Sequence, residues 1–365
     1  MKPLVSMSAA AGVLIVGFVN AQGPTMFKLG TFERAGRQFV GVVLRDSVVI
    51  DLAAANAALA SPSATVASPT DMKDLIARYD AGVRARITQI VTSVDSAPAP
   101  RPSYVYDLKA LKTLPPIMYP TAILNVALNY VEHSREMAGL NSGPPPIQPG
   151  GPLPGAATKD TTSMPGIWER QANDGRWNPY MFLKAASAVI ADGESIRLPV
   201  GRDRVDWECE LGVVIGRAAA RVPVARANDF IFGYTLENDV SDRGGRGDTR
   251  YGSDWLVGKS HDTFAPMGPF IVPKEFVADP RKLKVKFTLN GQVMQDADTS
   301  LMIHDVFEQV SYGSHIMTLR PGDVIATGSP AGVGSARKPP VFFKPGDVSV
   351  CTYEGVGTLT NPVVR

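Results

Sequence analysis

The chain has 365 residues, of which 44% are hydrophobic and 20% charged; this composition is typical of a globular protein and excludes disordered, fibrous and coiled-coil chains. Lys and Arg number 37 against 35 Asp and Glu, and no stretch combines clustered basic residues with aromatic ones. Nucleic acid is therefore not an expected partner. The length exceeds one modest core, so we expect a large domain with a smaller companion.

A short apolar run lies near the beginning of the chain. Residues 9–19 follow Lys2 and lead to Val-Asn-Ala ending at Ala21, a pattern that favours a secretory signal peptide over residues 1–21. The run is shorter than the roughly 18 residues of a transmembrane helix, so no membrane span is expected. If residues 1–21 are a signal peptide, we expect the protein to be periplasmic or secreted. The alternative is a true start at Met26, which makes it cytoplasmic.

Two kinds of periodicity follow in the first third of the chain. Residues 27–52 predict short strands, because β-branched and aromatic residues are interrupted by turn residues. Over 72–91 apolar residues recur at helical spacing. Pro-rich segments at 96–102 and 114–116 then mark the end of this region. We expect a small β-rich N-terminal domain over 26–115 and a second domain over 118–365.

The second domain contains a long loop and many short strands. Residues 139–179 are so rich in Gly and Pro that we expect a lid or insertion there rather than a helix or strand. Beyond Tyr180 short strands predominate, and the clearest helix is predicted at 302–319. Cys209 and Cys351 are too few for a disulfide framework and lack zinc-site spacing. The sequence leaves open whether they pair.

Acidic residues on two strands are candidate metal ligands. Acidic and apolar residues alternate over 205–216, so Glu208 and Glu210 share a face with Cα atoms about 6 to 7 Å apart. A cation between them would keep both ionised, and Mg²⁺ or Mn²⁺ prefers such oxygen ligands. A later strand offers Asp239 or Glu237 as a third ligand, and spacing does not choose between them. The alternative is a solvated strand face.

Three further segments offer catalytic groups. Lys259 lies in an apolar context, where it can stabilise developing negative charge, although a lone lysine is usually a surface charge. His133 and Glu136 share a face if their segment is helical, and the carboxylate can then orient the imidazole as a base. The alternative is a surface ion pair. Residues 319–334 offer backbone N–H groups for an oxyanion, or simply a tight turn.

Taken in order, these segments resemble the fumarylacetoacetate hydrolase family, in its acylpyruvase-like branch, over residues 26–364. The matching motifs are LNY before His133 and Glu136, DWECELGVVIG, YTLENDVSDR, GKSHDTFAPMGP, LNGQVMQDADTS, LRPGDVIATGSPAGVG and EGVGTLTNPV. The resemblance implies an α+β, mostly β fold with a C-terminal β-roll domain and a small β-rich N-terminal domain, assembled as a homodimer. It selects Asp239 over Glu237 as the ligand beside Glu208 and Glu210.

The resemblance also implies roles for side chains around the metal. His133 with Glu136 would activate a water, and Lys259 would stabilise charge beside Mg²⁺, for which Mn²⁺ or Ca²⁺ are alternatives. Substrate-binding positions carried over from the family are Tyr130, Lys184, Arg243 and Ser329. Gly244 and Arg246 stand where the family usually has Asp and Gln, which leaves the choice of substrate open.

The implied reaction is metal-dependent hydrolysis of a carbon–carbon bond in a 2,4-dioxo acid, such as an acylpyruvate or a fumarylacetoacetate-like molecule, through a metal-stabilised enolate. Two alternatives remain. One is a decarboxylase or tautomerase of 2-oxo acids from the same family. The other is a non-catalytic exported protein that binds a dicarboxylate. The paired His133 and Glu136 favour hydrolysis.

Overall fold

The computed structural model describes most of the chain. The described residues are 25–60, 66–96, 100–138, 174, 176, 178–244 and 254–365. The predicted signal peptide, nearly all of the predicted lid and Arg246 lie outside these residues. Within them, no helix is both long and apolar enough to span a membrane.

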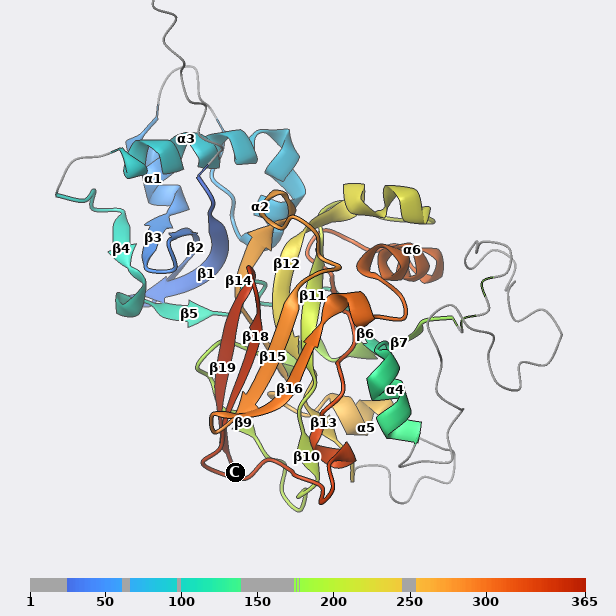
Figure 1. Cartoon of the computed structure of the whole chain (residues 1–365). Helices are drawn as coiled ribbons and strands as arrows, with labels where there is room; N and C mark the ends of the chain where they lie inside the picture. The colour runs from blue at the N-terminus through green and yellow to red at the C-terminus, as the bar shows by residue number, and fades with distance from the viewer. Residues whose placement is uncertain are drawn as a thin grey trace, which may run out of the picture.

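The N-terminal region is an antiparallel sheet covered by helices (Figure 1). Its strands are β1 (Lys28–Arg34), β2 (Arg37–Leu44), β3 (Val48–Asp51), β4 (Val105–Asp107) and β5 (Lys112–Leu114), and its helices are α1 (Leu52–Ala58), α2 (Met72–Arg78) and α3 (Val83–Asp95). The predicted helix over 72–91 is therefore two helices. They are separated at Gly82, whose φ of 109° lies in the left-handed region that interrupts a right-handed helix.

β1 joins the N-terminal strands to the main sheet, since Leu29 is paired with Ile271 of β14. Ten strands of this twelve-stranded sheet follow the order β4-β3-β2-β1-β14-β12-β11-β17-β6-β7, and the other two, β5 and β8, pair with β1 and β14. The further strands are β6 (Ile123–Ala127), β7 (Tyr180–Lys184), β8 (Val189–Ile190), β11 (Cys209–Ile215), β12 (Ile231–Asn238), β14 (Ala265–Pro273) and β17 (Val324–Ala326). The chain runs from β7 into β8, which pairs with β14. The part of the sheet from β14 to β7 thus rolls back on itself, because the strand that follows β7 pairs with β14.

A five-stranded sheet packs against this roll, and in Figure 1 its orange and red strands lie in front of the roll. It contains β9 (Ile196–Arg197), β15 (Lys284–Leu289), β16 (Gln292–Asp298), β18 (Val348–Tyr353) and β19 (Gly357–Val364), and β10 (Val205–Asp206) pairs separately with β13 (Ser241–Asp242). The remaining α-helices are α4 (Val131–Ala138), α5 (Trp255–Lys259) and α6 (Val306–Ile316). Helix α6 is shorter at both ends than the helix predicted over 302–319, because the Asp305 side chain caps its first turn.

Short 3₁₀ segments connect several of these elements. They are η1 (Tyr79–Ala81), η2 (Leu108–Ala110), η3 (Ala186–Ala188), η4 (Val224–Phe230), η5 (Lys274–Phe276), η6 (Thr299–Leu301) and η7 (Gly334–Ala336). The mixture of large sheets with few helices confirms the prediction of a mostly β, α+β fold. The division into domains at about residue 118 stays a prediction.

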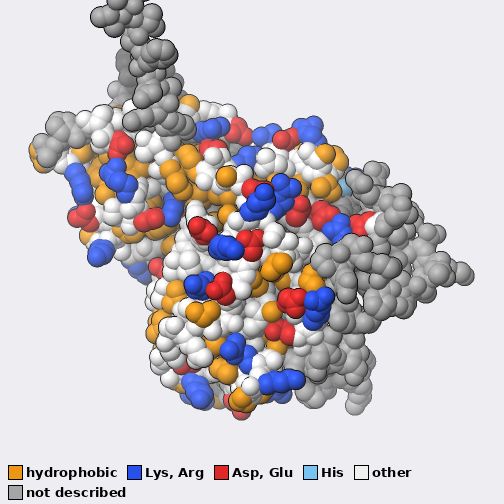
Figure 2. Space-filling model, viewed as in Figure 1, with side chains coloured by type: hydrophobic (Ala, Val, Ile, Leu, Met, Phe, Trp, Pro, Cys, Tyr) orange, Lys and Arg blue, Asp and Glu red, His pale blue; other side chains and the backbone are white. Residues whose placement is uncertain are grey.

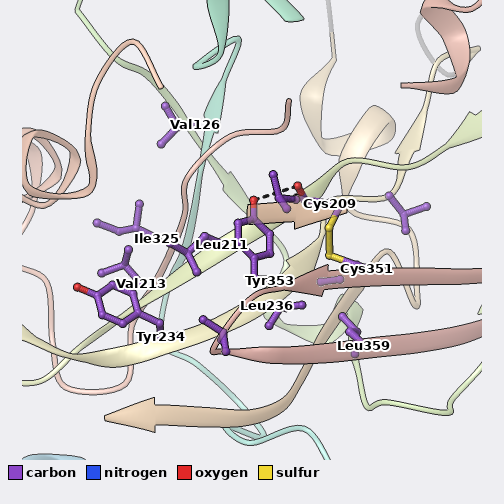
Figure 3. Packing of buried hydrophobic residues seen from close by; sticks show 14 of the residues in the cluster. Val126, Cys209, Leu211, Val213, Tyr234, Leu236, Ile325, Cys351, Tyr353 and Leu359 are labelled. Atoms are coloured by element: carbon purple, nitrogen blue, oxygen red, sulfur yellow. Dashed lines mark hydrogen bonds between the residues drawn. A yellow bond between two sulfur atoms is a disulfide. The ribbon is translucent and has the colours of Figure 1, made fainter. Parts of the chain in front are cut away.

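The largest apolar core lies between the roll and the five-stranded sheet. Leu211, Val213, Tyr234 and Leu236 converge in it (Figure 3). The strand alternation predicted one buried and one polar face for 205–216, but every residue of β11 is buried. The second face of β11 carries Glu210, which is buried among other acidic side chains.

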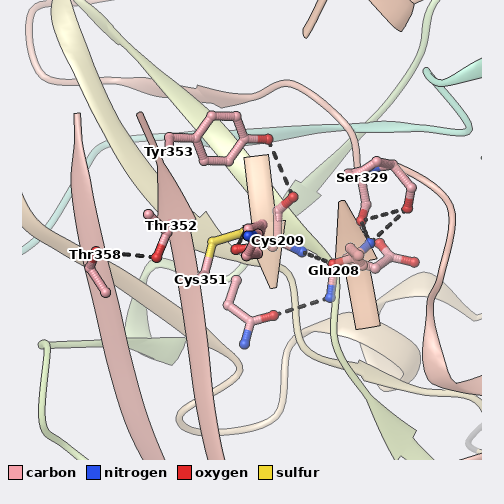
Figure 4. Close-up of a disulfide and its surroundings, with 11 residues drawn as sticks. Glu208, Cys209, Ser329, Cys351, Thr352, Tyr353 and Thr358 are labelled. Atoms are coloured by element: carbon pink, nitrogen blue, oxygen red, sulfur yellow. Dashed lines mark hydrogen bonds between the residues drawn. A yellow bond between two sulfur atoms is a disulfide. The ribbon is translucent and has the colours of Figure 1, made fainter. Parts of the chain in front are cut away.

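The two cysteines form a disulfide, which the sequence had left open. The Cα atoms of Cys209 and Cys351 are 5.5 Å apart, and the bond connects β11 in the roll with β18 in the five-stranded sheet (Figure 4). Both residues are buried. Cys209 lies between Glu208 and Glu210 in the chain, so this covalent link is adjacent to the candidate metal ligands.

Basic and acidic side chains are interspersed over the face of the molecule in Figure 2. Neither sign gathers into a continuous field among the described residues visible there. A groove for nucleic acid needs such a basic field, and this face does not supply one.

Candidate metal centre and catalytic site

Four carboxylates lie together at one end of the paired strands β11 and β12, two within the strands and two one residue beyond them. Glu210 is directly opposite Glu237 in the antiparallel register, and opposed residues place their side chains on the same face. Next along the pair, the Asp239 backbone N–H donates to the Glu208 carbonyl at 2.8 Å. All four side chains are buried. The two strands therefore bring together every acidic residue that the sequence proposed as a metal ligand.

Three of the four carboxylates converge. Glu208, Glu210 and Asp239 each offer an oxygen, and these oxygens lie within 4.8 Å of one another. Glu237 instead accepts a hydrogen bond at 2.9 Å from Asn125 on β6. The converging oxygens thus include Asp239 and not Glu237, and the ligand set that the family resemblance implied stays a prediction.

The turn after β17 holds one of these carboxylates. The Gly328 backbone N–H donates to Glu210 Oε2 at 2.8 Å. Gly328 has a φ of 93°, and an added Cβ would lie 2.6 Å from Asn129 Cβ and 2.8 Å from the Val126 carbonyl oxygen. Only glycine fits there. The predicted backbone N–H donor of residues 319–334 is therefore present, but its acceptor is a protein carboxylate.

Three cations surround the carboxylates, and two of them, Lys184 and Lys259, are buried. Lys259 Nζ lies 2.6 Å from Glu208 Oε2 and 2.5 Å from Asp239 Oδ2. Lys184 is ion-paired with Asp239. Arg243 donates to Glu208 Oε1 at 2.5 Å and to Asp206 Oδ1 at 2.7 Å. Arg243 was carried over as a substrate-binding residue, and in this geometry its guanidinium orients Glu208.

The fully ionised cluster would carry excess negative charge. It comprises five buried carboxylates (Asp206, Glu208, Glu210, Glu237, Asp239), the buried Lys184 and Lys259, and the half-buried Arg243, so ionisation of every group leaves two negative charges. Burial and the neighbouring Asp239, Glu237 and Glu208 raise the pKa of Glu210 well above its usual value. Such a carboxyl needs a further cation to remain ionised. A divalent ion among three hard oxygen ligands meets this need in charge and in ligand type.

Glu208 behaves differently from Glu210 within the same cluster. Burial opposes its ionisation, but Lys259, Arg243 and His133 outweigh burial and hold the pKa of Glu208 well below its usual value. Burial raises the pKa of Glu237 to about 7, with Lys184 opposing it. The cluster thus contains a firmly ionised ligand beside carboxyls whose charge depends on a cation.

His133 and Glu136 form the predicted dyad on helix α4. His133 Nδ1 lies 2.7 Å from Glu136 Oε1, and the Gly332 backbone N–H donates to both oxygens of Glu136, at 3.1 and 3.0 Å. A proton on Nδ1 satisfies this contact and leaves Nε2 as an acceptor. Nε2 lies 3.9 Å from Glu208 Oε1. The imidazole is buried and aimed at the carboxylate cluster, unlike a surface ion pair.

Two other predicted substrate-binding residues, Tyr130 and Ser329, are buried. Tyr130 is buried in the main core, where desolvation raises the pKa of its phenol. The Ser329 hydroxyl is buried and accepts from Gln295 Nε2 at 2.8 Å; Figure 4 shows Ser329 near Glu208. Gln295 was not singled out from the sequence, although it lies in one of the matching motifs.

Asp206 differs most from the sequence interpretation. The alternation over 205–216 predicts one continuous strand with Asp206 and Glu208 on the same face, but the strand is interrupted between β10 and β11. Asp206 accepts from Arg243 and, at 2.7 Å, from the Ser335 backbone N–H. It therefore supports the cluster through Arg243. Asn125, which holds Glu237, is another contributor that local sequence patterns did not reveal.

A sequence profile described as the fumarylacetoacetate (FAA) hydrolase C-terminal domain matches residues 122–364. The chain belongs to the fumarylacetoacetate hydrolase family. The mitochondrial oxaloacetate tautomerase fahd2 of Xenopus laevis is 32% identical over 292 residues, covering 78% of this chain and 81% of that protein. The relatives of this chain therefore include a protein named as a tautomerase.

Solved structures of the fumarylacetoacetate hydrolase family share this fold. The 5-carboxymethyl-2-hydroxymuconate delta-isomerase of Mycobacterium smegmatis is 30% identical, with a TM-score of 0.60 over 93% of this chain and 99% of that chain. The maleylpyruvate hydrolase of Sphingobium sp. SYK-6, in a complex with manganese(II) and pyruvate, is 26% identical, with a TM-score of 0.63 over 92% and 98%. The similar proteins thus include an isomerase and a hydrolase.

Proposed function

We propose that this protein is a metal-dependent enzyme that hydrolyses a carbon–carbon bond in a 2,4-dioxo acid such as an acylpyruvate. The observation that carries the proposal is the His133–Glu136 dyad, whose free Nε2 faces Glu208 of the carboxylate cluster at 3.9 Å. A base beside a candidate metal centre is the arrangement that activation of water requires.

Glu208, Glu210 and Asp239 would hold the metal, which we propose to be Mg²⁺, with Mn²⁺ or Ca²⁺ also suited to three carboxylates. When bound, the ion would act as a Lewis acid that polarises the carboxylate and 2-keto oxygens of the substrate. The manganese and pyruvate present in the similar maleylpyruvate hydrolase support both the metal and a pyruvate-like substrate portion.

The side chains around the cluster suit the remaining steps. His133 Nε2 would take a proton from water, while Glu136 holds Nδ1 protonated and the Gly332 N–H holds Glu136. The hydroxide attacks the carbonyl distal to the carboxylate, and the carbon–carbon bond between the two halves breaks with its electron pair left on the pyruvate half. The proton that His133 took from water then returns to that carbon, which gives pyruvate and the free acid and restores the base. Lys259, buried against two of the ligands, would stabilise the negative charge left on the pyruvate half.

Tautomerisation of a 2-oxo acid is the second candidate. The 32% identity to a protein named oxaloacetate tautomerase favours it. The same residues could serve, because His133 would then move a proton between substrate carbon and oxygen without adding water. A non-catalytic dicarboxylate-binding protein is the third possibility, and multiple turnover on any oxo acid would exclude it.

One panel experiment separates these functions. The purified protein is incubated with acylpyruvates and with oxaloacetate, with Mg²⁺ or with a chelator, and free acid, carbon dioxide and keto–enol interconversion are measured. Hydrolysis predicts equimolar pyruvate and free acid, abolished by the chelator and restored by Mg²⁺. Interconversion of oxaloacetate without acid release would replace hydrolysis by tautomerisation, and carbon dioxide release would indicate decarboxylation. The homodimer stays a prediction, which light scattering of the same sample tests.

A further inference from the structure

Three aromatic side chains form a continuous group beside Lys259, and we name them the aromatic strip: Tyr180 and Phe182 on β7, and Trp255 on α5. The ring centroids of Phe182 and Trp255 are 4.8 Å apart, and those of Tyr180 and Trp255 are 5.3 Å apart. Lys259 Nζ lies 5.4 Å from the Phe182 ring centroid. The strip is therefore in direct contact with a cation of the carboxylate cluster.

The strip lies on the face of β7 that carries the cluster. Alternate residues of a strand share a face, so Tyr180, Phe182 and Lys184 point to one side. Lys184 is ion-paired with Asp239. Asn125, opposite Phe182 in the β6–β7 register, donates to Glu237. Lys184 and Asn125, the two neighbours of Phe182, thus contact acidic residues of the cluster. The Phe182 side chain lies on the same side of β7.

Exposure increases along the strip with distance from the cluster. Lys184 is buried, Phe182 and Trp255 are half-buried, and Tyr180 is 55% exposed. The strip is an aromatic path from the buried Lys259 to the surface. A substrate whose carboxylate end lies at the metal ligands would extend its other end along such a path.

We propose that the aromatic strip binds the acyl group of the substrate, so that this enzyme prefers a phenyl or extended unsaturated acyl group to a methyl group. This inference rests on the proposed function and deepens it. Flat apolar groups stack on aromatic rings and bury apolar area that a methyl group lacks. Selectivity through one apolar group in a pocket is about 10- to 200-fold, so we expect a preference of at least about tenfold.

The test compares benzoylpyruvate with acetylpyruvate in steady-state kinetics. The variants are Trp255→Ala and Phe182→Leu, which remove aromatic surface at two points of the strip. Leu183→Ala is the matched control, because Leu183 is 58% exposed on the same strand and points to the opposite face. Circular dichroism and thermal melting check the fold of each variant.

Each strip variant should lower the ratio of kcat/KM for benzoylpyruvate to that for acetylpyruvate by about tenfold, mainly through KM. Leu183→Ala should leave the ratio unchanged. An unchanged ratio in both folded strip variants, or a wild type that prefers acetylpyruvate, would overturn the inference while leaving the hydrolase assignment intact.

Binding distinguishes failure of the inference from failure of the proposed function. If the wild type cleaves neither acid, the proposed reaction is wrong, and calorimetric titration of the Mg²⁺-loaded protein with phenylpyruvate and pyruvate then tests the strip. Trp255→Ala should weaken phenylpyruvate binding about tenfold and leave pyruvate binding within threefold. Equal weakening of both would overturn the role of the strip.

Discussion

Glu208 contacts more of the neighbouring cationic and imidazole side chains than any other candidate ligand among the described residues. Lys259 and Arg243 donate to its two oxygens, and His133 Nε2 lies 3.9 Å away. Glu208→Gln keeps the shape and removes the charge. We expect it to weaken Mg²⁺ binding at least tenfold and abolish detectable hydrolysis, because a neutral amide is a poorer ligand for a hard cation. Calorimetric Mg²⁺ titration and the activity assay check both effects. Unchanged metal affinity would contradict the ligand assignment.

His133 should be separable from metal binding, because it contacts the cluster only at its edge. His133→Ala is expected to retain Mg²⁺ affinity within a few-fold and to lower kcat by about 10²- to 10⁴-fold, the usual contribution of a general base. Glu136→Gln should have a smaller effect, since it disturbs only the orientation of the imidazole. Normal acylpyruvate cleavage by the alanine variant would show that another group is the base.

At the scale of elements, the backbone conformation of the turn after β17 positions the N–H group that holds the candidate metal ligand Glu210. Gly328→Ala would place a Cβ 2.6 Å from Asn129 Cβ at a φ of 93°, and would disturb the N–H that holds Glu210. Gly346→Ala is the matched control, because its φ is 95° and no atom lies within 4 Å of the added Cβ. We expect about 1 kcal/mol of destabilisation for the control, with Mg²⁺ affinity unchanged. Gly328→Ala should lower both the unfolding temperature and the affinity substantially more. Similar behaviour of the two variants would contradict this role.

The first turn of helix α6 carries an acid-sensitive ion pair. Arg176 donates two hydrogen bonds to Glu308, and although burial opposes ionisation, His304 and Arg176 lower the pKa of Glu308 from 4.5 to about 2. A lowered pKa in the folded state stabilises the protein above pH 4.5, and this contribution is lost as the pH falls towards 2. Thermal melting between pH 7 and pH 3 should show a gap between wild type and Glu308→Gln that narrows with acidification. A constant gap would contradict the assignment.

At the scale of the whole molecule, the disulfide connects the two sheets at the centre of the protein. Cys209 and Cys351 are separated by 142 residues, and cross-links across long loops restrict the unfolded chain most. The double variant Cys209→Ser/Cys351→Ser should lose about 2–4 kcal/mol of unfolding free energy, measured by urea denaturation. Reductant should lower the midpoint for the wild type and leave the variant unaffected. Equal stability of both proteins would show that the bond has no structural role.

The sequence alone determined the features that depend on near neighbours in the chain. The alternation over 205–216 was sufficient to place Glu208 and Glu210 on one face, and the spacing of His133 and Glu136 predicted their contact, because strand and helix periodicity are local. The ordered motifs identified the family and its mostly β fold, which the family profile and the strand pairing confirm.

Tertiary structure decided which distant residues meet. In the register of β11 on β12, Glu237 is hydrogen-bonded to Asn125, and Asp239 lies with the other two candidate ligands. The rolling of the sheet brings Lys184 to Asp239, and the packing of the two sheets pairs Cys209 with Cys351. These contacts join segments separated by 55 to 142 residues. No local periodicity contains them, because they depend on strand register and sheet closure, which are set by burial of the core as a whole.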